Sequence, residues 1–293
     1  MVTLRDAGRL PKVRRTIGKP APGINPWPLL CCSSGYTGTK NERAGMNPIV
    51  VIPSRMAATR LPGKPLADIN GIAMIVHVLN RGREADIGPV AVACAEPEIA
   101  AAVRAAGGIA VLTDPSLPRG SDRVHAALSI LDPHGKHDVV VNLQGDLPTI
   151  PPDYIRAVLA PLADPAIDIA TLVAPITTDE EARSPSVVKA ACAFDGGRAV
   201  SPALYFSRAT IPAGPGPLWH HIGIYAFRRQ ALARFVALPE SPLERRESLE
   251  QLRALEAGMR ISCARVEHAP FGVDTQADLE RARAALLPIE KTS

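Results

Sequence analysis

The chain has 293 residues, of which 46% are hydrophobic and 21% charged, and this composition is typical of a globular protein. Its formal charge of +4 is misleading, because eight of the 33 lysines and arginines but only two of the 29 acidic residues lie in residues 1–45. The remainder has a slight excess of acids, which argues against a nucleic-acid-binding surface. No apolar run approaches the roughly 20 residues that a membrane-spanning helix needs, so membrane insertion is not expected.

Residues 1–45 differ in character from the rest of the chain. Pro, Gly, Ser and Thr are scattered through them without a helical or strand period, so we expect a disordered or non-native extension. The arginines and the scarcity of acids also resemble an organelle transit peptide, but Met46 stands directly before the first strand and favours a start there. The five cysteines form no CxxC pair or Cys/His cluster, so the sequence indicates neither a zinc site nor a disulfide frame. This cysteine pattern favours a reducing, cytoplasmic setting.

From residue 46 onward, apolar runs alternate with helical patterns. We predict strands at 48–53, 90–94, 109–113 and 138–143, and helices at 72–85, 96–106, 121–131 and 152–162. Strands that are apolar throughout are buried on both faces, so they indicate an α/β fold with a mostly parallel central sheet between helices.

The rhythm changes after a strand at 168–175. We predict a hairpin formed by 187–194 and 199–205, a strand at 221–227, a long helix at 243–257, a strand at 261–266 and a closing helix at 276–287. Residues 46–293 are therefore expected to form one domain. We expect its first half to be nucleotide-binding, as in α/β sheets of this kind, and its segment 176–242 to form an inserted β-containing lobe.

A cluster of cations follows the first predicted strand. Arg55, Arg60 and Lys64 lie in a loop with almost no acid, and Gly63 would let a ligand approach the backbone closely. Open α/β sheets bind ligands at the carboxyl ends of their strands, and arginine and lysine are suited to phosphate. The alternative is a solvated basic loop. The position of the cluster favours a triphosphate site, although the GxxxxGK[ST] pattern of a P-loop is missing.

Two aspartates are candidates for binding a metal ion. Asp146 follows the strand in "VVVNLQGDLP", where a carboxylate can hold Mg²⁺ beside phosphate or can simply belong to a turn. Asp274 in "GVDT" precedes the last helix, where it can be the N-cap of that helix or the second metal ligand. The sequence pattern leaves both alternatives open.

Six ordered motifs, which span about residues 48–287, resemble the 3-deoxy-manno-octulosonate cytidylyltransferase family. They are "PSRMAATRLPGKPL", "VNLQGDLP", "LYFSRATIP", "HIGIYAFR", "SPLERRESLEQLR" and "GVDTQADLERAR". The resemblance implies a Rossmann-like nucleotidyltransferase, usually a homodimer. Such an enzyme joins CTP to 3-deoxy-manno-octulosonate (Kdo) and releases pyrophosphate, in lipopolysaccharide biosynthesis. The segment 176–242 would then serve sugar binding and dimerisation.

The resemblance also assigns roles to individual residues. It places Arg55, Arg60 and Lys64 on the triphosphate and Asp146 and Asp274 on Mg²⁺, and these five are the expected catalytic residues. Further nucleotide contacts are expected from Gly120, Ser121 and Arg123, and sugar contacts from Gln144, Arg208, His221, Tyr225, Glu250 and Gln251. Arg119, Asp122 and Leu147 depart from the family pattern without removing a proposed phosphate or metal ligand.

Three other functions are alternatives to a Kdo cytidylyltransferase. The nearest is a cytidylyltransferase for another acidic sugar, such as 8-amino-Kdo or a sialic acid. A glycosyltransferase of similar fold would usually need a D-x-D motif, and Gln144-Gly145-Asp146 lacks its first aspartate. A nucleotide-binding regulator without catalysis is the third, and the presence of both candidate metal carboxylates argues against it.

Overall fold

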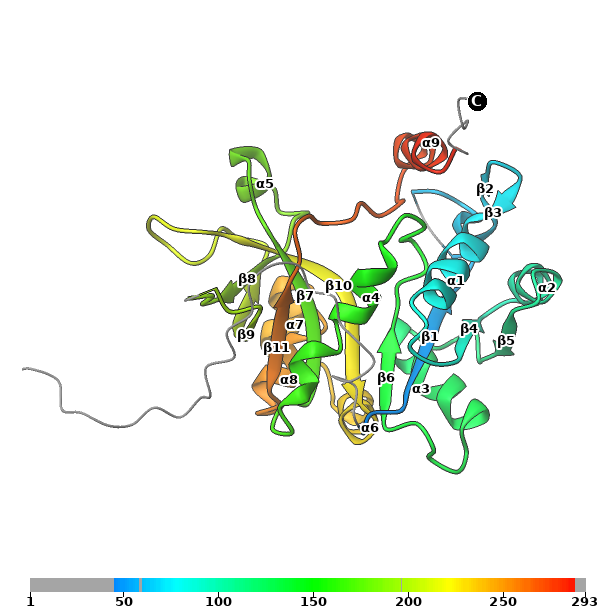
Figure 1. Ribbon diagram of the computed structural model, residues 1–293, viewed down its shortest axis with the longest axis horizontal. Helices are drawn as coiled ribbons and strands as arrows, with labels where there is room; N and C mark the ends of the chain where they lie inside the picture. The colour runs from blue at the N-terminus through cyan, green and yellow to red at the C-terminus, as the bar shows by residue number, and fades with distance from the viewer. Residues whose placement is uncertain (1–44, 58–59, 196, 288–293) are drawn as a thin grey trace, which may run out of the picture. The chain divides into compact units, whose positions relative to one another are not determined.

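The computed structural model describes residues 45–57, 60–195 and 197–287. The extension predicted for residues 1–45 thus lies outside the described residues, apart from Gly45. In the described part, a nine-stranded sheet has the order β5-β4-β1-β6-β10-β7-β11-β9-β8 (Figure 1).

The first half of the sheet is parallel, as the apolar runs predict. It consists of β1 (Pro48–Ser54), β4 (Val90–Cys94), β5 (Ile109–Leu112) and β6 (Val139–Asn142). The helices between these strands are α1 (Met74–Glu84), α2 (Pro97–Ala105) and α3 (Gly120–Leu131), and α4 (Pro152–Ala157) follows β6. The predicted helix at 152–162 ends early and continues as a short 3-10 turn, η3 (Ala160–Ala163).

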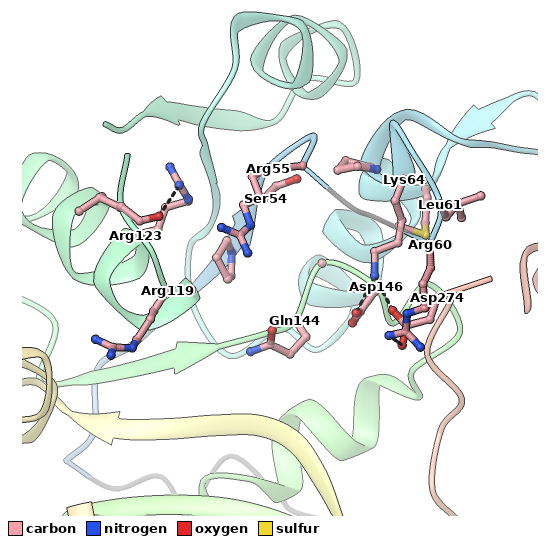
Figure 2. Close-up of a pocket in the computed structure, with 17 residues that line it drawn as sticks. Ser54, Arg55, Arg60, Leu61, Lys64, Arg119, Arg123, Gln144, Asp146 and Asp274 are labelled. Atoms are coloured by element: carbon pink, nitrogen blue, oxygen red, sulfur yellow. Dashed lines mark hydrogen bonds and ion pairs between the residues drawn. The ribbon is translucent and has the colours of Figure 1, made fainter. Parts of the chain in front are cut away.

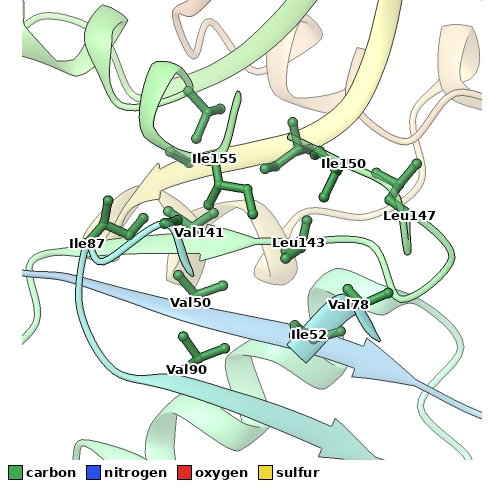
Figure 3. Packing of buried hydrophobic residues seen from close by; sticks show 14 of the residues in the cluster. Val50, Ile52, Val78, Ile87, Val90, Val141, Leu143, Leu147, Ile150 and Ile155 are labelled. Atoms are coloured by element: carbon green, nitrogen blue, oxygen red, sulfur yellow. The ribbon is translucent and has the colours of Figure 1, made fainter. Parts of the chain in front are cut away.

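Strands β1, β4 and β6 bury both of their faces, and the two faces carry different helices, whereas the edge strand β5 leaves Ile109 and Leu112 exposed. Alternate residues such as Val50 and Ile52 pack with side chains of α1, α2 and α4 in one apolar cluster (Figure 3). Their neighbours Ile49 and Val51 pack with side chains of α3 and of α6 (Arg229–Ala237) in a second cluster on the opposite face. This alternation follows from the two-residue period of a strand.

The second half of the sheet is mixed. Its strands are β7 (Ile169–Pro175), β8 (Lys189–Cys192), β9 (Val200–Ser207), β10 (Trp219–Arg228) and β11 (Ile261–Arg265). Strands β8 and β9 pair antiparallel, as the predicted hairpin requires, and they continue the central sheet through the pairing of β9 with β11. The segment 176–242, which also holds α5 (Asp179–Arg183), is thus joined to the main sheet by hydrogen bonds. A single further pair, His220 with Lys189, connects β8 back to β10 and closes a ring of five strands.

One predicted helix is wrong. Residues 243–257 form two short helices, α7 (Pro242–Glu247) and α8 (Leu252–Glu256), separated by Ser248 in the left-handed region at φ 54° and ψ 47°. Arg253 of α8 is buried and forms hydrogen bonds with the Glu244 carboxylate of α7. In a straight helix, residues nine apart would lie on opposite faces, so this buried ion pair requires the chain to bend between them.

The end of the described chain packs against its beginning. The short hairpin of β2 (Asp68–Ile69) and β3 (Ile72–Ala73) lies beside α9 (Gln276–Ala285) (Figure 1). Side chains of both elements share a third apolar cluster, and the Arg283 Nε atom donates a hydrogen bond to the Asp68 carbonyl oxygen at 2.9 Å. Helix α1 therefore begins two residues later than the predicted helix at 72–85, because Ile72 and Ala73 belong to this hairpin.

Candidate active site

A cavity of about 460 Å³ lies at the carboxyl ends of β1 and β6. The predicted cation loop forms one wall, and Gly63, with φ 69°, turns the chain into a 3-10 turn, η2 (Lys64–Leu66). A residue other than glycine would be strained in this left-handed conformation. Eight of the residues predicted from the sequence line the cavity: Arg55, Arg60, Lys64, Gly120, Arg123, Gln144, Asp146 and Asp274.

The two candidate metal ligands meet at one lysine. The Lys64 Nζ atom lies 2.9 Å from an Asp146 oxygen and 3.0 Å from an Asp274 oxygen. The Arg60 Nη2 atom lies 3.0 Å from the other Asp274 oxygen. Figure 2 shows these four side chains together at one end of the cavity. A backbone hydrogen bond from the Val273 N–H to the Asp146 carbonyl oxygen, at 2.9 Å, joins the two loops that carry the aspartates.

The structure decides one alternative that the sequence left open. Thr275 is the N-cap of α9, and its side chain forms a reciprocal capping box with Asp278. The Asp274 carboxylate therefore does not cap the helix and is directed instead to Lys64 and Arg60. The cap was readable in the sequence as Thr-x-x-Asp, one position later than the pattern we considered.

The electrostatics of this group keep the lysine charged. Burial alone lowers the pKa of Lys64, but the charges and hydrogen bonds of Asp146 and Asp274 outweigh it and raise the pKa above its ordinary value. With Arg60, the two carboxylates have two cationic partners, so the group is formally neutral.

Elsewhere in the cavity lie Arg55 and Arg123, neither of which forms an ion pair with a carboxylate of the described residues. Arg123 is buried and donates hydrogen bonds to the Thr113 hydroxyl and to the carbonyl oxygens of Asp114 and Leu117. It therefore fixes the loop before α3. The Arg55 Nη1 atom lies 3.4 Å from the Pro118 carbonyl oxygen, a weak hydrogen bond that leaves most of its donors for a ligand.

Arg119 is a lining residue that the sequence reasoning did not propose. Its guanidinium is paired with Glu240 at 2.5 Å, and it lies between the first cavity and the Glu250 carboxylate, 3.9 Å away. The available signal was a cation directly before Gly120, which we noted only as a departure from the family pattern.

A smaller cavity of about 70 Å³ adjoins the first, and Gly120 and Gln144 line both. Predicted residues in it are Ser121, Tyr225, Glu250 and Gln251. The Ser121 hydroxyl donates a hydrogen bond to Glu250, whose pKa burial raises. The Gln251 amide nitrogen is buried and has no hydrogen-bond partner among the described residues, which marks it as a donor suited to a ligand.

Two predicted sugar contacts lie outside the lining of both cavities. The Arg208 guanidinium donates to the backbone carbonyl oxygens of Glu247 and Pro185, at 2.9 and 3.0 Å. The His221 imidazole is buried, and its Nε2 atom lies 3.0 Å from the Thr171 hydroxyl. Burial lowers the pKa of His221 to about 3, so this side chain is neutral at neutral pH.

Mg²⁺ is the metal ion that the family resemblance implies for this site. In the part of the chain that the structure describes, no group of three or more His, Cys, Asp or Glu side chains is arranged to hold a metal ion. Proteins usually bind Mg²⁺ through one or two carboxylates together with substrate phosphates and water. Two aspartates that converge on one point of a cation-lined cavity fit this mode of binding, in which the substrate completes the coordination.

The fold and the site together define a nucleotidyltransferase, in which cations and carboxylates converge at the carboxyl ends of a Rossmann-like sheet. Residues 49–261 match the cytidylyltransferase family model. A 3-deoxy-manno-octulosonate cytidylyltransferase of Paramagnetospirillum magneticum is 62% identical over 243 residues, covering 83% of this chain and 99% of the relative. One of Rhodospirillum centenum is 64% identical over 245 residues, covering 84% and 95%.

Solved structures agree with these relatives. A CMP:2-keto-3-deoxy-manno-octonic acid synthetase complexed with CTP is 40% identical, with a TM-score of 0.75 over 82% of this chain and 98% of its own. A 4-diphosphocytidyl-2C-methyl-D-erythritol synthase, 13% identical with a TM-score of 0.56 over 82% and 98% of the two chains, shares the fold. The chain belongs to the cytidylyltransferase family and, within it, to the 3-deoxy-manno-octulosonate cytidylyltransferases.

Proposed function

We propose that this protein transfers the CMP group of CTP to 3-deoxy-manno-octulosonate and releases pyrophosphate, as a step in lipopolysaccharide biosynthesis. The observation that carries the proposal is the 460 Å³ cavity, which combines the cations Arg55, Arg60 and Lys64 with two converging carboxylates. Relatives at 62–64% identity that bear this activity in their names support it, and they favour it over the glycosyltransferase alternative.

The reaction joins two anions, so charge neutralisation and positioning are the main tasks of the protein. The anomeric hydroxyl oxygen of the sugar bonds to the α-phosphorus of CTP, the bond to the pyrophosphate oxygen breaks, and the hydroxyl proton passes to solvent. Arg55, Arg60 and Lys64 offset the negative charge on the departing pyrophosphate. Asp146 and Asp274 would hold Mg²⁺, which when bound supplies positive charge to the phosphate oxygens.

The second cavity adjoins this region and is proposed to bind the sugar acid. Its buried amide donor on Gln251, the Tyr225 side chain and the Glu250 carboxylate can hydrogen-bond hydroxyl groups. Gln144 lines both cavities, so it lies where the two substrates would meet.

Location and assembly are proposals of the same kind. We propose a cytoplasmic enzyme, supported by the free thiols of Cys94, Cys192 and Cys263. In the described part of the chain, no helix is both long enough and apolar enough to cross a membrane.

We also propose a homodimer, in line with the family resemblance and with Leu204 of β9, which is 72% exposed. Sedimentation velocity of the purified protein tests the dimer.

The test of function is release of pyrophosphate from CTP, measured with a panel of sugar acids that includes Kdo, 8-amino-Kdo and a sialic acid. The proposal expects the highest kcat/KM with Kdo and CTP, and a CMP-sugar product by mass spectrometry. Preference for another acid of the panel would retain the cytidylyltransferase and replace its sugar. Absence of product with every acid would overturn the proposed function.

A further inference from the structure

The cations proposed for the triphosphate are already engaged with the carboxylates proposed for the metal ion. Lys64 bridges Asp146 and Asp274, and Arg60 holds the second oxygen of Asp274 (Figure 2). Without nucleotide, therefore, each aspartate already has an internal positive partner. Metal ion and lysine would compete for the same two carboxylates.

The lysine and a divalent ion cannot occupy this point together. A Mg²⁺ ion bound by both carboxylates needs oxygens at about 2.0–2.1 Å, close to where the Lys64 ammonium contacts them. Two positive charges this close repel each other. The side chain of Lys64 is 17% exposed, whereas that of Arg60 is 67% exposed and screened by solvent, so Lys64 is the main competitor.

The lysine and the two aspartates face the same cavity. Lys64, Asp146 and Asp274 all line the 460 Å³ cavity, and the flexible four-carbon stem of lysine allows its ammonium to turn within it. A triphosphate would offer Lys64 new anionic partners and would release both carboxylates for the ion.

We propose that Lys64 acts as an internal counter-ion, which keeps divalent cations off Asp146 and Asp274 until a nucleoside triphosphate arrives. This proposal rests on the proposed function, because it assigns the cavity to a triphosphate and a metal ion. The nucleotide draws Lys64 onto its phosphates, and the ion then takes the place of the ammonium between the carboxylates. The ion brings one more positive charge to the carboxylates than the ammonium that it replaces, which the phosphates of the nucleotide offset, and the free enzyme does not load the metal first.

The test measures binding of Mn²⁺ alone to the full-length protein, by electron paramagnetic resonance of the free ion, in the absence of nucleotide. Lys64→Met removes the charge and keeps the length of the side chain, and Lys64→Gln is a second variant in case methionine impairs folding. Lys64→Arg keeps the charge. Lys136→Met, at an exposed lysine outside both cavities, is the matched control.

The expected result is that Lys64→Met and Lys64→Gln bind Mn²⁺ about tenfold or more tightly than the wild type. Lys64→Arg and Lys136→Met should bind as weakly as the wild type, and adding Asp146→Asn to Lys64→Met should abolish the gain. Equal affinity in wild type and Lys64→Met, including no binding by either at millimolar Mn²⁺, would overturn the proposal.

The outcome is separable from that of the proposed function. Tighter Mn²⁺ binding in Lys64→Met, together with no CMP-sugar formed by the wild type, would keep the counter-ion role and reject the substrates. Normal CMP-Kdo synthesis by the wild type, together with unchanged Mn²⁺ binding in Lys64→Met, would keep the proposed substrates and reject the counter-ion role.

Discussion

At the scale of single residues, Asp146 and Asp274 carry the most specific expectation. Asp146→Asn and Asp274→Asn should each lower kcat by about 100-fold or more, because each removes one of the two carboxylates proposed to hold the metal ion. The folded state should change little, since the carboxylates are 31% and 42% exposed and such pairs contribute only about 0–1 kcal/mol. Pyrophosphate release and thermal melting measure the two effects.

Asp153→Asn is the control for those variants. Asp153 forms an ion pair with Arg156 on the surface and is 72% exposed. The Asp153→Asn variant should retain full activity. An aspartate variant of the site that turns over normally at ordinary Mg²⁺ concentration does not belong to the metal site.

The two cavities predict a division of labour between residues. Arg60→Ala and Lys64→Ala should raise KM for CTP more than KM for Kdo, whereas Gln251→Ala should do the opposite. A lost charged contact should cost about 1.5–3 kcal/mol, or roughly 10- to 100-fold, and a neutral one about 0.5–1.5 kcal/mol. Steady-state kinetics with each substrate varied, supported by direct binding, gives the comparison. Equal effects on both substrates would mean that the cavities do not separate nucleotide from sugar.

At the scale of elements, the loop after β6 depends on a close approach to β1. A Cβ atom on Gly145 would lie 2.9 Å from the Pro53 carbonyl oxygen, so Gly145→Ala must push this loop away and displace Asp146. We expect a loss of about 1–3 kcal/mol in stability and a higher Mg²⁺ requirement. Gly272→Ala is the matched control in the other aspartate loop, because its Cβ would meet nothing nearer than 3.8 Å. Urea unfolding and Mg²⁺ titration of activity compare the variants, and indistinguishable behaviour would contradict the steric argument.

Elements defined by local pattern were predicted well, and elements defined by distant contacts were not. The apolar runs predict β1, β4 and β6 and their parallel arrangement, because both faces of these strands are buried. The break at Ser248 depends on the buried pair of Arg253 and Glu244, which no local pattern reveals. The five-stranded ring similarly depends on one pair between β8 and β10, which are far apart in the chain.

The same distinction applies to the candidate site. Strand ends predict where Arg55, Lys64 and Asp146 gather, since the position of a loop in an α/β sheet follows from the order of elements. The second cavity depends on how β10 and the bend at Ser248 meet α3, so the predicted set was only partly brought together there. Arg208 and His221 lie outside the lining.

At the scale of the whole molecule, pH should act through a buried histidine. The folded-state pKa of His221 is about 3, chiefly because burial disfavours its charged form, whereas an unfolded histidine titrates near 6.5. Between pH 6.5 and 3, therefore, the unfolded chain binds a proton at His221 that the folded protein does not bind. The stabilising contribution is complete above pH 6.5 and falls by up to about 1.4 kcal/mol per pH unit as the pH decreases toward 3.

Urea unfolding of the wild type and His221→Gln at pH 7.5 and 5.5 measures this contribution. The glutamine amide ends near the position of the histidine Nε2 atom, which contacts Thr171, and it does not titrate. Between the two pH values, the variant should lose about 1.4 kcal/mol less than the wild type. The same loss in both proteins would show that His221 is not the group that senses pH.

The packing of α9 against the β2–β3 hairpin has a consequence for synthesis of the protein. The strands and loops that supply Lys64 and Asp146 emerge from the ribosome before Asp274 and α9, which follow β11, the last strand of the sheet in chain order. A nascent chain that has folded its sheet thus presents Lys64 to one carboxylate alone. Because domains fold from the N-terminal side during translation, the reaction centre is completed only after the strands of the sheet and the segment that carries Asp274 have been made.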